Sequence, residues 1–286
     1  MRLHFQHCVR RLVKTAFTKV ELIGASLEGL THVADLVSPL SDDQWHADTP
    51  CPGWQVADVV AHLADFESFL SGNPRATDEP DWVNLPHVVG ETGKFIELGV
   101  QARRGTSKAE LIAELRELIE LRRAILNTDT GDLNSQVRGP FGGPITLERA
   151  LTMRGFDTWI HEQDIRDAIG APGGWSGLPF EVALSVLINA LPVVWGKNSK
   201  PPVNAVLNII ISDLASEVFV RFDDDGRARF IELGEPTVQL KISVSDLVHL
   251  MCGRVSANNP EFLDRIDVSG PDELVQRLIV GMVVTP

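Results

Sequence analysis

The sequence predicts an α+β protein in which an N-terminal four-helix bundle is followed by a small α+β domain. Four segments before residue 170 repeat apolar residues at the spacing of one face of an α-helix, whereas four runs after residue 200 read as strands. A Pro/Gly-rich stretch, APGGWSGLP at residues 171–179, separates the two patterns. We therefore predict two domains, residues 1–172 and 173–286.

The first two helices of the bundle are predicted at residues 20–39 and 54–70. The first keeps its helical spacing until the Ser38-Pro39 step, which stops it. A turn-rich stretch then leads into the second helix, where an apolar stripe indicates the face toward a core. The stripe consists of Val56, Val59, Val60, Leu63 and Phe66.

The third and fourth helices are each preceded by a loop. Residues 71–86 are polar and contain three prolines, which predicts a surface loop long enough to act as a lid. Residues 108–126 combine leucines at heptad-like spacing with alternating charges, which is typical of an amphipathic helix. After a second loop at residues 127–146, a helix is predicted from about Leu147 to Ala168, with Thr146 as its N-cap.

The C-terminal domain is predicted to begin with a helix over residues 179–191 and to continue with strands. The strand-like runs are AVLNIIIS, EVFVRFDD, RARFIELG and TVQLKIS. The DDDG sequence before Arg227 predicts a hairpin turn. Two helices follow: SVSDLVHLMCGRV, with Ser245 as the expected cap, and PDELVQRLIVGM, which opens after Gly270-Pro271.

Composition favours a small ligand over a polyanion or a bilayer. The 39 acidic and 26 basic residues give a net charge of −13, which repels nucleic acid and anionic membranes. No apolar run was expected to reach the length that spans a bilayer. Three widely spaced cysteines indicate a reducing compartment, so we predict a cytoplasmic protein; its oligomeric state stays open. Residues 1–20 carry five basic and no acidic side chains and favour an amphipathic helix or an extension over a targeting signal.

Three residues of the predicted bundle form a candidate metal site. Asp157 and His161 are four residues apart, so both side chains point from one face of the fourth helix. His62 lies in an otherwise apolar part of the second helix and would supply a third ligand. Spacing alone favours the alternatives, in which His62 is a hydrogen-bonded core histidine and Asp157 with His161 belongs to a solvated helix face.

Two imidazoles and a carboxylate leave coordination positions open, which is typical of a catalytic zinc site, although the same ligands suit nickel, iron or manganese. Neighbouring polar side chains are expected to orient the imidazoles by hydrogen bonding. The candidates are Asp58 and Asp65 for His62, and Gln163 and Asp164 for His161.

Three stretches of the chain resemble the actinobacterial mycothiol-dependent maleylpyruvate isomerase family, a branch of the DinB-like metalloproteins. They are TPCPGWQVADVVAHLADFE, RGFDTWIHEQDIRDAIGAPGGW and the terminal MCGRV…IDVSGPDELVQRLIV. The resemblance implies a bundle that binds a divalent metal, usually zinc, through His62, His161 and Asp157, where the family usually has Glu. It also implies a sterol-carrier-like C-terminal domain with Arg254 in its Gly-Arg step.

The resemblance further implies an enzyme that uses a thiol. In the characterised isomerase the metal binds the thiol of mycothiol, and the thiolate adds to a cis double bond, which allows rotation and elimination to the trans isomer. We expect a metal- and thiol-dependent isomerase or S-transferase with mycothiol or a similar thiol, such as bacillithiol, as cosubstrate. The alternative is a non-catalytic metal-binding or partner-binding protein. Arg254 is the candidate catalytic residue that would hold a substrate carboxylate, with Arg265 and Arg277 as alternatives.

Overall fold

The computed structural model describes residue 14 and residues 16–285. Contacts within the chain divide it into two compact units, Phe17–Ala183 and a second unit that includes Leu184–Pro286, and the division falls inside helix α8 (Leu178–Val193). The domain boundary predicted between residues 172 and 173 stays a prediction. The helix or extension predicted for residues 1–20 falls mainly outside the described residues, as does Cys8.

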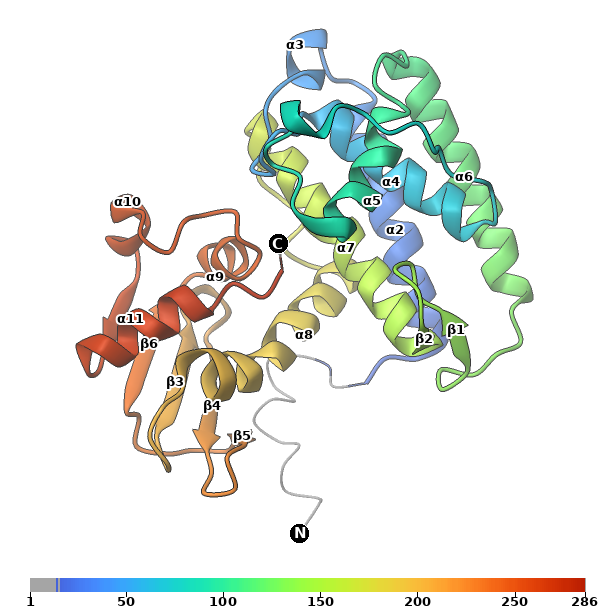
Figure 1. Ribbon diagram of the computed structural model, residues 1–286. Helices are drawn as coiled ribbons and strands as arrows, with labels where there is room; N and C mark the ends of the chain where they lie inside the picture. The colour runs from blue at the N-terminus through green and yellow to red at the C-terminus, as the bar shows by residue number, and fades with distance from the viewer. Residues whose placement is uncertain (1–13, 15, 286) are drawn as a thin grey trace. The chain divides into compact units, whose positions relative to one another are not determined.

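The first unit is the helical bundle predicted from the sequence (Figure 1). Helix α2 packs against α6 and α7, and α4 packs against α5, α6 and α7. Thr18, Ser107 and Thr146 accept backbone hydrogen bonds at the starts of α2, α6 and α7, and the cap predicted at Thr146 is thereby confirmed. The elements are α2 (Lys19–Val37), α3 (Asp42–Trp45), α4 (Val56–Leu70), η1 (Trp82–Asn84), α5 (Gly90–Gln101), α6 (Lys108–Thr128), β1 (Gln136–Arg138), β2 (Pro144–Thr146) and α7 (Leu147–Ile169).

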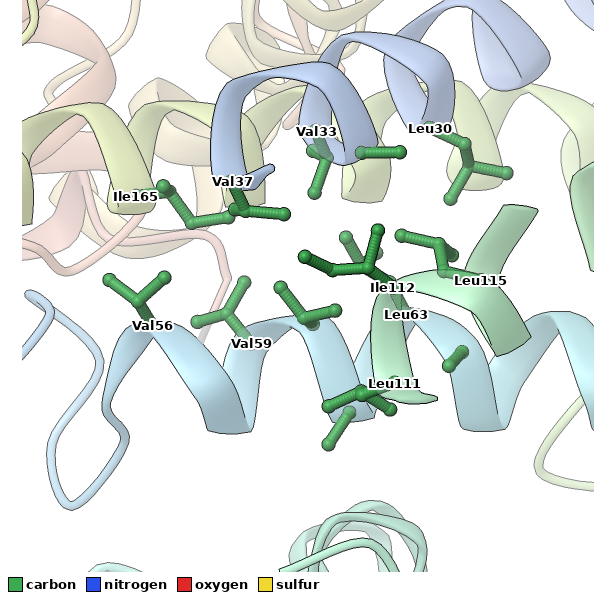
Figure 2. Packing of buried hydrophobic residues seen from close by; sticks show 14 of the residues in the cluster. Leu30, Val33, Val37, Val56, Val59, Leu63, Leu111, Ile112, Leu115 and Ile165 are labelled. Atoms are coloured by element: carbon green, nitrogen blue, oxygen red, sulfur yellow. The ribbon is translucent and has the colours of Figure 1, made fainter. Parts of the chain in front are cut away.

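Aliphatic side chains from four helices form the core of this unit (Figure 2). Each side chain that leaves water here contributes about 1.5–3 kcal/mol to folding, before the cost of ordering it. This burial holds α4 and α7 in fixed positions relative to each other, which is what the candidate metal site requires. Residues labelled in the figure include Leu30, Val33 and Val37 of α2, Val56, Val59 and Leu63 of α4, Leu111, Ile112 and Leu115 of α6, and Ile165 of α7.

Helix α5 and the β1–β2 hairpin are two elements that the sequence pattern did not predict. Glycines at positions 90, 93 and 99 weaken the helical signal of α5, because glycine is a poor helix former. Gly99 is required by packing: a Cβ there would lie 2.1 Å from the carboxylate of Asp65. Because glycine has no Cβ, the carboxylate of Asp65 fits against α5 and pairs there with Arg75 and Arg103.

The second unit contains a five-stranded sheet of order β5-β4-β3-β6-β7. Strands β3 and β6 are parallel, with Ile209 opposite Leu240, and the other neighbouring pairs are antiparallel. Leu207, Ile209 and Leu240 are fully buried within the sheet. The strands are β3 (Val206–Ile211), β4 (Ser216–Phe222), β5 (Ala228–Ile231), β6 (Val238–Ile242) and β7 (Asp267–Ser269).

The remaining elements of this unit are η2 (Val194–Ser199), η3 (Ser212–Leu214), α9 (Val244–Met251), α10 (Pro260–Leu263) and α11 (Asp272–Gly281). Of these, the helices α9 and α11 were predicted from the sequence, whereas η2, η3 and α10, like the strand β7, were not. The hairpin turn between β4 and β5 is confirmed, because Asp223 donates its backbone N–H to the carbonyl of Arg227 at 2.8 Å. The cap predicted at Ser245 is wrong: Ser243 accepts the capping hydrogen bond, so α9 begins two residues earlier than predicted.

One continuous helical stretch, Leu178–Ser199, is long and apolar enough to cross a membrane by length and composition, with a mean hydropathy of 1.7. The expectation that no apolar run reaches this length is therefore wrong. In the most apolar part of this stretch, 61% is buried inside the protein. A core helix of a soluble protein passes the same test, so this single helix is weak support for a membrane span.

Candidate metal centre

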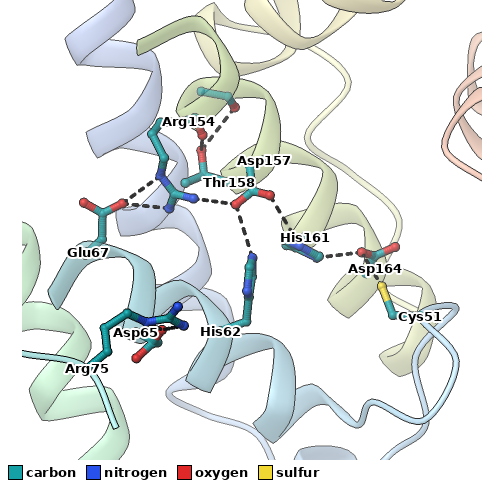
Figure 3. A network of polar contacts seen from close by, with 11 residues as sticks. Cys51, His62, Asp65, Glu67, Arg75, Arg154, Asp157, Thr158, His161 and Asp164 are labelled. Carbon is teal, nitrogen blue, oxygen red and sulfur yellow. Dashed lines mark hydrogen bonds and ion pairs between the residues drawn. The ribbon is translucent and has the colours of Figure 1, made fainter. Parts of the chain in front are cut away.

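His62, Asp157 and His161 lie together where α4 faces α7 (Figure 3). Helix α4 presents His62, whose side chain is 3% exposed, and α7 presents the other two residues one turn apart. Nε2 of His62 is 3.4 Å from Oδ2 of Asp157, and Nε2 of His161 is 3.7 Å from Oδ1 of the same carboxylate. Candidate ligand atoms of the three residues all lie within 4.8 Å of one another.

These separations fit a shared cation better than a set of hydrogen bonds. Two ligands at about 2.0–2.1 Å from a tetrahedral zinc lie roughly 3.3 Å apart, whereas a good N–H···O bond is nearer 2.9 Å. The distances of 3.4 and 3.7 Å are long for hydrogen bonds and close to that ligand separation. The donor set of two imidazole nitrogens and a carboxylate suits zinc and related divalent metals.

The protonation states also suit ligands. Burial alone would raise the pKa of Asp157, but the Arg154 guanidinium and the two imidazoles hold this pKa far below its ordinary value. Burial lowers the pKa of His62 below its ordinary value, although the nearby Asp157 carboxylate by itself would raise this pKa. Near neutral pH the site therefore presents a carboxylate and a neutral His62 imidazole, which are the forms that bind a metal.

One of the orienting contacts predicted from the sequence is confirmed. Nδ1 of His161 lies 2.8 Å from Oδ2 of the buried Asp164, so this carboxylate accepts a hydrogen bond from the Nδ1–H. The other ring nitrogen, Nε2, is left directed at Asp157. The Cys51 thiol also donates to Oδ2 of Asp164, with an Sγ–O distance of 3.1 Å. Asp164 thereby fixes both the ring and its tautomer.

The orienting role expected for Asp58 and Asp65 is wrong. Asp58 accepts the backbone N–H of Gln55 at the start of α4 and pairs with Arg104 at 2.8 Å. Asp65 faces α5 and its two arginine partners. Among the described residues Nδ1 of His62 has no hydrogen-bond partner, so packing and the contact of Nε2 with Asp157 orient this ring. Both acids share a helix face with His62, but arginines from other segments of the chain pair with their carboxylates, which the spacing does not reveal.

Aromatic rings enclose the two histidines. The ring centroid of Trp54 lies 5.2 Å from that of His62 and 6.0 Å from that of His161, and the ring of Phe66 packs against His62 at 5.0 Å. The Trp54 indole donates to the buried Glu97 at 2.9 Å. Gly53 precedes Trp54 with φ +78°, a backbone conformation that favours glycine. These rings keep water from the nitrogen atoms, whereas Asp157 remains 31% exposed.

Asp157 also belongs to a buried chain of charges that the sequence reading missed. Nη1 of Arg154 lies 2.5 Å from Oδ2 of Asp157, and Nε and Nη2 of Arg154 donate to Oε1 of Glu67. Arg122 donates to Oε2 of the same Glu67 at 3.0 Å. The signal for Arg154 was its position three residues before Asp157. Glu67 and Arg122 gave no local signal, because they meet across 55 residues of sequence.

A second group of potential ligands overlaps the first. Cys51, His161 and Asp164 also bring candidate ligand atoms within 4.8 Å of one another. Here, however, Asp164 already accepts hydrogen bonds from both neighbours, at 2.8 and 3.1 Å. The contacts of this group are satisfied, which favours an orienting role over ligation.

The three candidate arginines lie in the second unit, and each has a polar contact there. Arg254 donates from Nη1 to the carbonyl of Cys252 at 2.7 Å, which is a contact within its own turn. Arg265 pairs with Asp246 at 2.8 Å, and Arg277 donates to the carbonyl of Ser199 at 2.9 Å. The catalytic role suggested for Arg254 stays a prediction.

The fold and the buried His–Asp–His group define a helical-bundle protein with a candidate metal centre and an appended α+β unit. Residues 27–166, which include all three candidate ligands, match the family model described as mycothiol maleylpyruvate isomerase N-terminal domain. Over these residues, which are just under half of the chain, the protein is similar to the mycothiol-dependent maleylpyruvate isomerase family.

Solved structures show that the likeness in fold extends beyond the bundle. A crystal structure of the mycothiol-dependent maleylpyruvate isomerase superposes with a TM-score of 0.57, at 17% identity, over 88% of this chain and 93% of that chain. A mutant of that enzyme, with a histidine replaced by alanine, gives 0.56 with the same coverage. The predicted α+β class is confirmed.

Curated relatives match only part of the chain. Two proteins of Mycobacterium tuberculosis, one from strain CDC 1551 / Oshkosh and one from strain ATCC 25618 / H37Rv, are each 28% identical to it over 137 residues. Both are described as uncharacterized proteins. The aligned part is 47% of this chain and 51% of each relative, so the chain spans about half the length of the curated relatives it matches.

Proposed function

We propose that the protein is a metal-dependent enzyme that uses a low-molecular-weight thiol, either as a maleylpyruvate isomerase-like isomerase or as a thiol S-transferase. The observation that carries this proposal is the convergence of His62, Asp157 and His161 at ligand-like separations. The match of residues 27–166 to a family model supports it, because that model is described as mycothiol maleylpyruvate isomerase N-terminal domain.

His62, Asp157 and His161 would hold the metal, which we propose to be zinc. A divalent cation at this position would supply a Lewis acid that lowers the pKa of a thiol enough to deprotonate it near neutral pH. Nickel, iron and manganese accept the same ligands, so elemental analysis of the purified protein decides the metal.

The surrounding residues have separate tasks in this proposal. Asp164 accepts a hydrogen bond from the Nδ1–H of His161 and so keeps the Nε2 lone pair of this ring directed at the site. Trp54 and Phe66 exclude water from the imidazoles, which strengthens electrostatic interactions at the site. Because Asp157 is the most exposed of the three candidate ligands, at 31% against 3% and 8%, the thiol would approach on the side of this carboxylate.

The location and the partners follow from the same chemistry. The chain has three widely spaced cysteines, of which Cys51 and Cys252 are buried, and this low cysteine content is compatible with the cytoplasmic location that we propose. The partners would be a small-molecule substrate and the thiol, with mycothiol as the first candidate. A non-catalytic metal-binding protein on the same fold is the alternative, and it differs by binding metal without turnover.

We expect turnover to require both the metal and the thiol. The zinc-loaded full-length chain should isomerise maleylpyruvate, or conjugate an electrophile to mycothiol, and should lose at least about 99% of this rate when either component is omitted. Absorbance of the cis and trans isomers and loss of free thiol provide the two readouts. Equal turnover without thiol would contradict the proposal, and metal binding without turnover of either kind would favour the non-catalytic alternative.

A further inference from the structure

The guanidinium of Arg154 is held between two carboxylates inside the bundle (Figure 3). Its side chain is 10% exposed, and Glu67 opposite it is 2% exposed. Glu67 accepts from Nε and Nη2 of Arg154 through one oxygen and from Arg122 through the other. Two of the three guanidinium nitrogen atoms, Nε and Nη2, are directed at Glu67. The third, Nη1, is therefore held in a fixed direction, toward Asp157.

That direction selects one oxygen of a candidate metal ligand. Nη1 of Arg154 lies 2.5 Å from Oδ2 of Asp157, the oxygen that Nε2 of His62 also faces at the longer distance of 3.4 Å. Among the described imidazoles of the site, Oδ1 of the same carboxylate faces only Nε2 of His161, at 3.7 Å. A guanidinium at hydrogen-bond distance withdraws electron density from the oxygen it contacts and neutralises the carboxylate charge. The opposite charges of Arg154, Arg122, Glu67 and Asp157 balance one another, two against two.

We propose that Arg154, fixed by Glu67, is a positioning residue that reserves Oδ2 of Asp157 and so limits this carboxylate to one oxygen for a metal ion. This inference rests on the proposed function. A cation held by two neutral imidazoles and a carboxylate already paired with an arginine keeps most of its double charge. Such a cation binds more weakly but attracts an anionic sulfur more strongly, because less of its charge is neutralised by the protein. The ligand class that the site then favours is a thiolate.

Two substitutions in this network should change metal affinity in opposite directions. Arg154→Met removes the competitor for Asp157, and we expect Zn²⁺ to bind about tenfold or more tightly. Glu67→Gln removes the charge that draws Arg154 away from Asp157, and we expect Zn²⁺ to bind about tenfold more weakly. A purely structural role predicts weaker binding in both variants, because either change would loosen the site.

The measurement is a competition titration of the metal-free full-length protein with Zn²⁺ alone against a chromophoric chelator. Arg122→Met is the matched control, because Arg122 is a buried arginine that contacts Glu67 and not Asp157. We expect the Zn²⁺ affinity of this variant to stay within about threefold of wild type. In an Asp157→Ala background the effect of Arg154→Met should largely disappear, since it acts through this carboxylate. If Arg154→Met does not fold, the cycle of Glu67→Gln with Asp157→Ala tests the same point, because the fall in Glu67→Gln should disappear once Asp157 is removed.

The outcomes separate this inference from the proposed function. If His62→Ala binds Zn²⁺ as tightly as wild type, the metal site itself is misplaced and both fail. If binding depends on His62 but Arg154→Met binds Zn²⁺ no more tightly than wild type, only the role of Arg154 is overturned. Tighter binding in Arg154→Met that persists in the Asp157→Ala background also overturns it, because the effect would then be a general change in charge.

Discussion

Replacing His62 by alanine should weaken Zn²⁺ binding to the full-length chain by about 100-fold or more. His62 is 3% exposed and provides the only candidate ligand from α4 in the group with Asp157 and His161. The two ligands that remain both come from α7, and two ligands hold zinc poorly at neutral pH. Titration calorimetry of metal-free protein, with a competing chelator for the wild type, measures the difference.

His46→Ala is the matched control for this prediction. His46 is an exposed histidine of the same unit, and its ring contacts Gln55 at 3.3 Å. We expect this variant to bind Zn²⁺ as the wild type does, because His46 is in neither candidate ligand group. Equal loss of affinity in both variants would indicate nonspecific binding through surface histidines and would contradict the assignment.

Replacing Glu67 by alanine should lower the free energy of unfolding of the metal-free protein by about 3–5 kcal/mol. Glu67 is 2% exposed and balances the charges of two arginines that are each 10% exposed. Removing one partner of a buried ion pair leaves the other charge desolvated without compensation. Because Arg154 keeps its contact with Asp157, the larger part of the cost should come from Arg122.

The comparison with Glu67→Gln separates the loss of charge from the loss of shape. The glutamine side chain has the same size and still accepts a hydrogen bond through one oxygen, so we expect a loss of about 1–2 kcal/mol. Urea titration followed by tryptophan fluorescence gives the free energy of unfolding of both variants from the midpoint and slope. An alanine variant within about 1 kcal/mol of wild type would show that water reaches Arg122 and Arg154.

The main helices were predictable because their signals are local. Helix α4 begins at Val56 and ends at Leu70, as the apolar stripe and the following polar loop indicate, and α7 begins directly after its cap Thr146. The pairing of Asp157 with His161 follows from helix geometry alone. Their encounter with His62 required two further facts, namely that α4 and α7 are neighbours and that their faces match in phase. The resemblance to a family supplied both.

Contacts between distant parts of the chain were not predictable in the same way. Glu67 looked like an ordinary polar residue near the end of α4, yet it is buried because Arg122 and Arg154 approach it from other helices. Asp65 was assigned to His62 from its spacing, but its carboxylate pairs with Arg75, in the loop before α5, and with Arg103, in the turn after α5. Burial of a charge depends on which residues fold against it, and a single sequence does not contain that information in local form.

The most direct test of the metal centre is X-ray absorption at the zinc edge, recorded on the zinc-loaded full-length protein before and after addition of mycothiol. We expect nitrogen and oxygen neighbours alone at about 2.0–2.1 Å before the thiol is added, and one additional sulfur neighbour at about 2.3 Å afterwards. Cys51→Ser should give the same two spectra, because Cys51 contacts Asp164 and lies outside the His62–Asp157–His161 group. A sulfur neighbour before the thiol is added, lost in Cys51→Ser, would place zinc in the overlapping group with Asp164, and no sulfur neighbour in either state would contradict thiol activation by the metal.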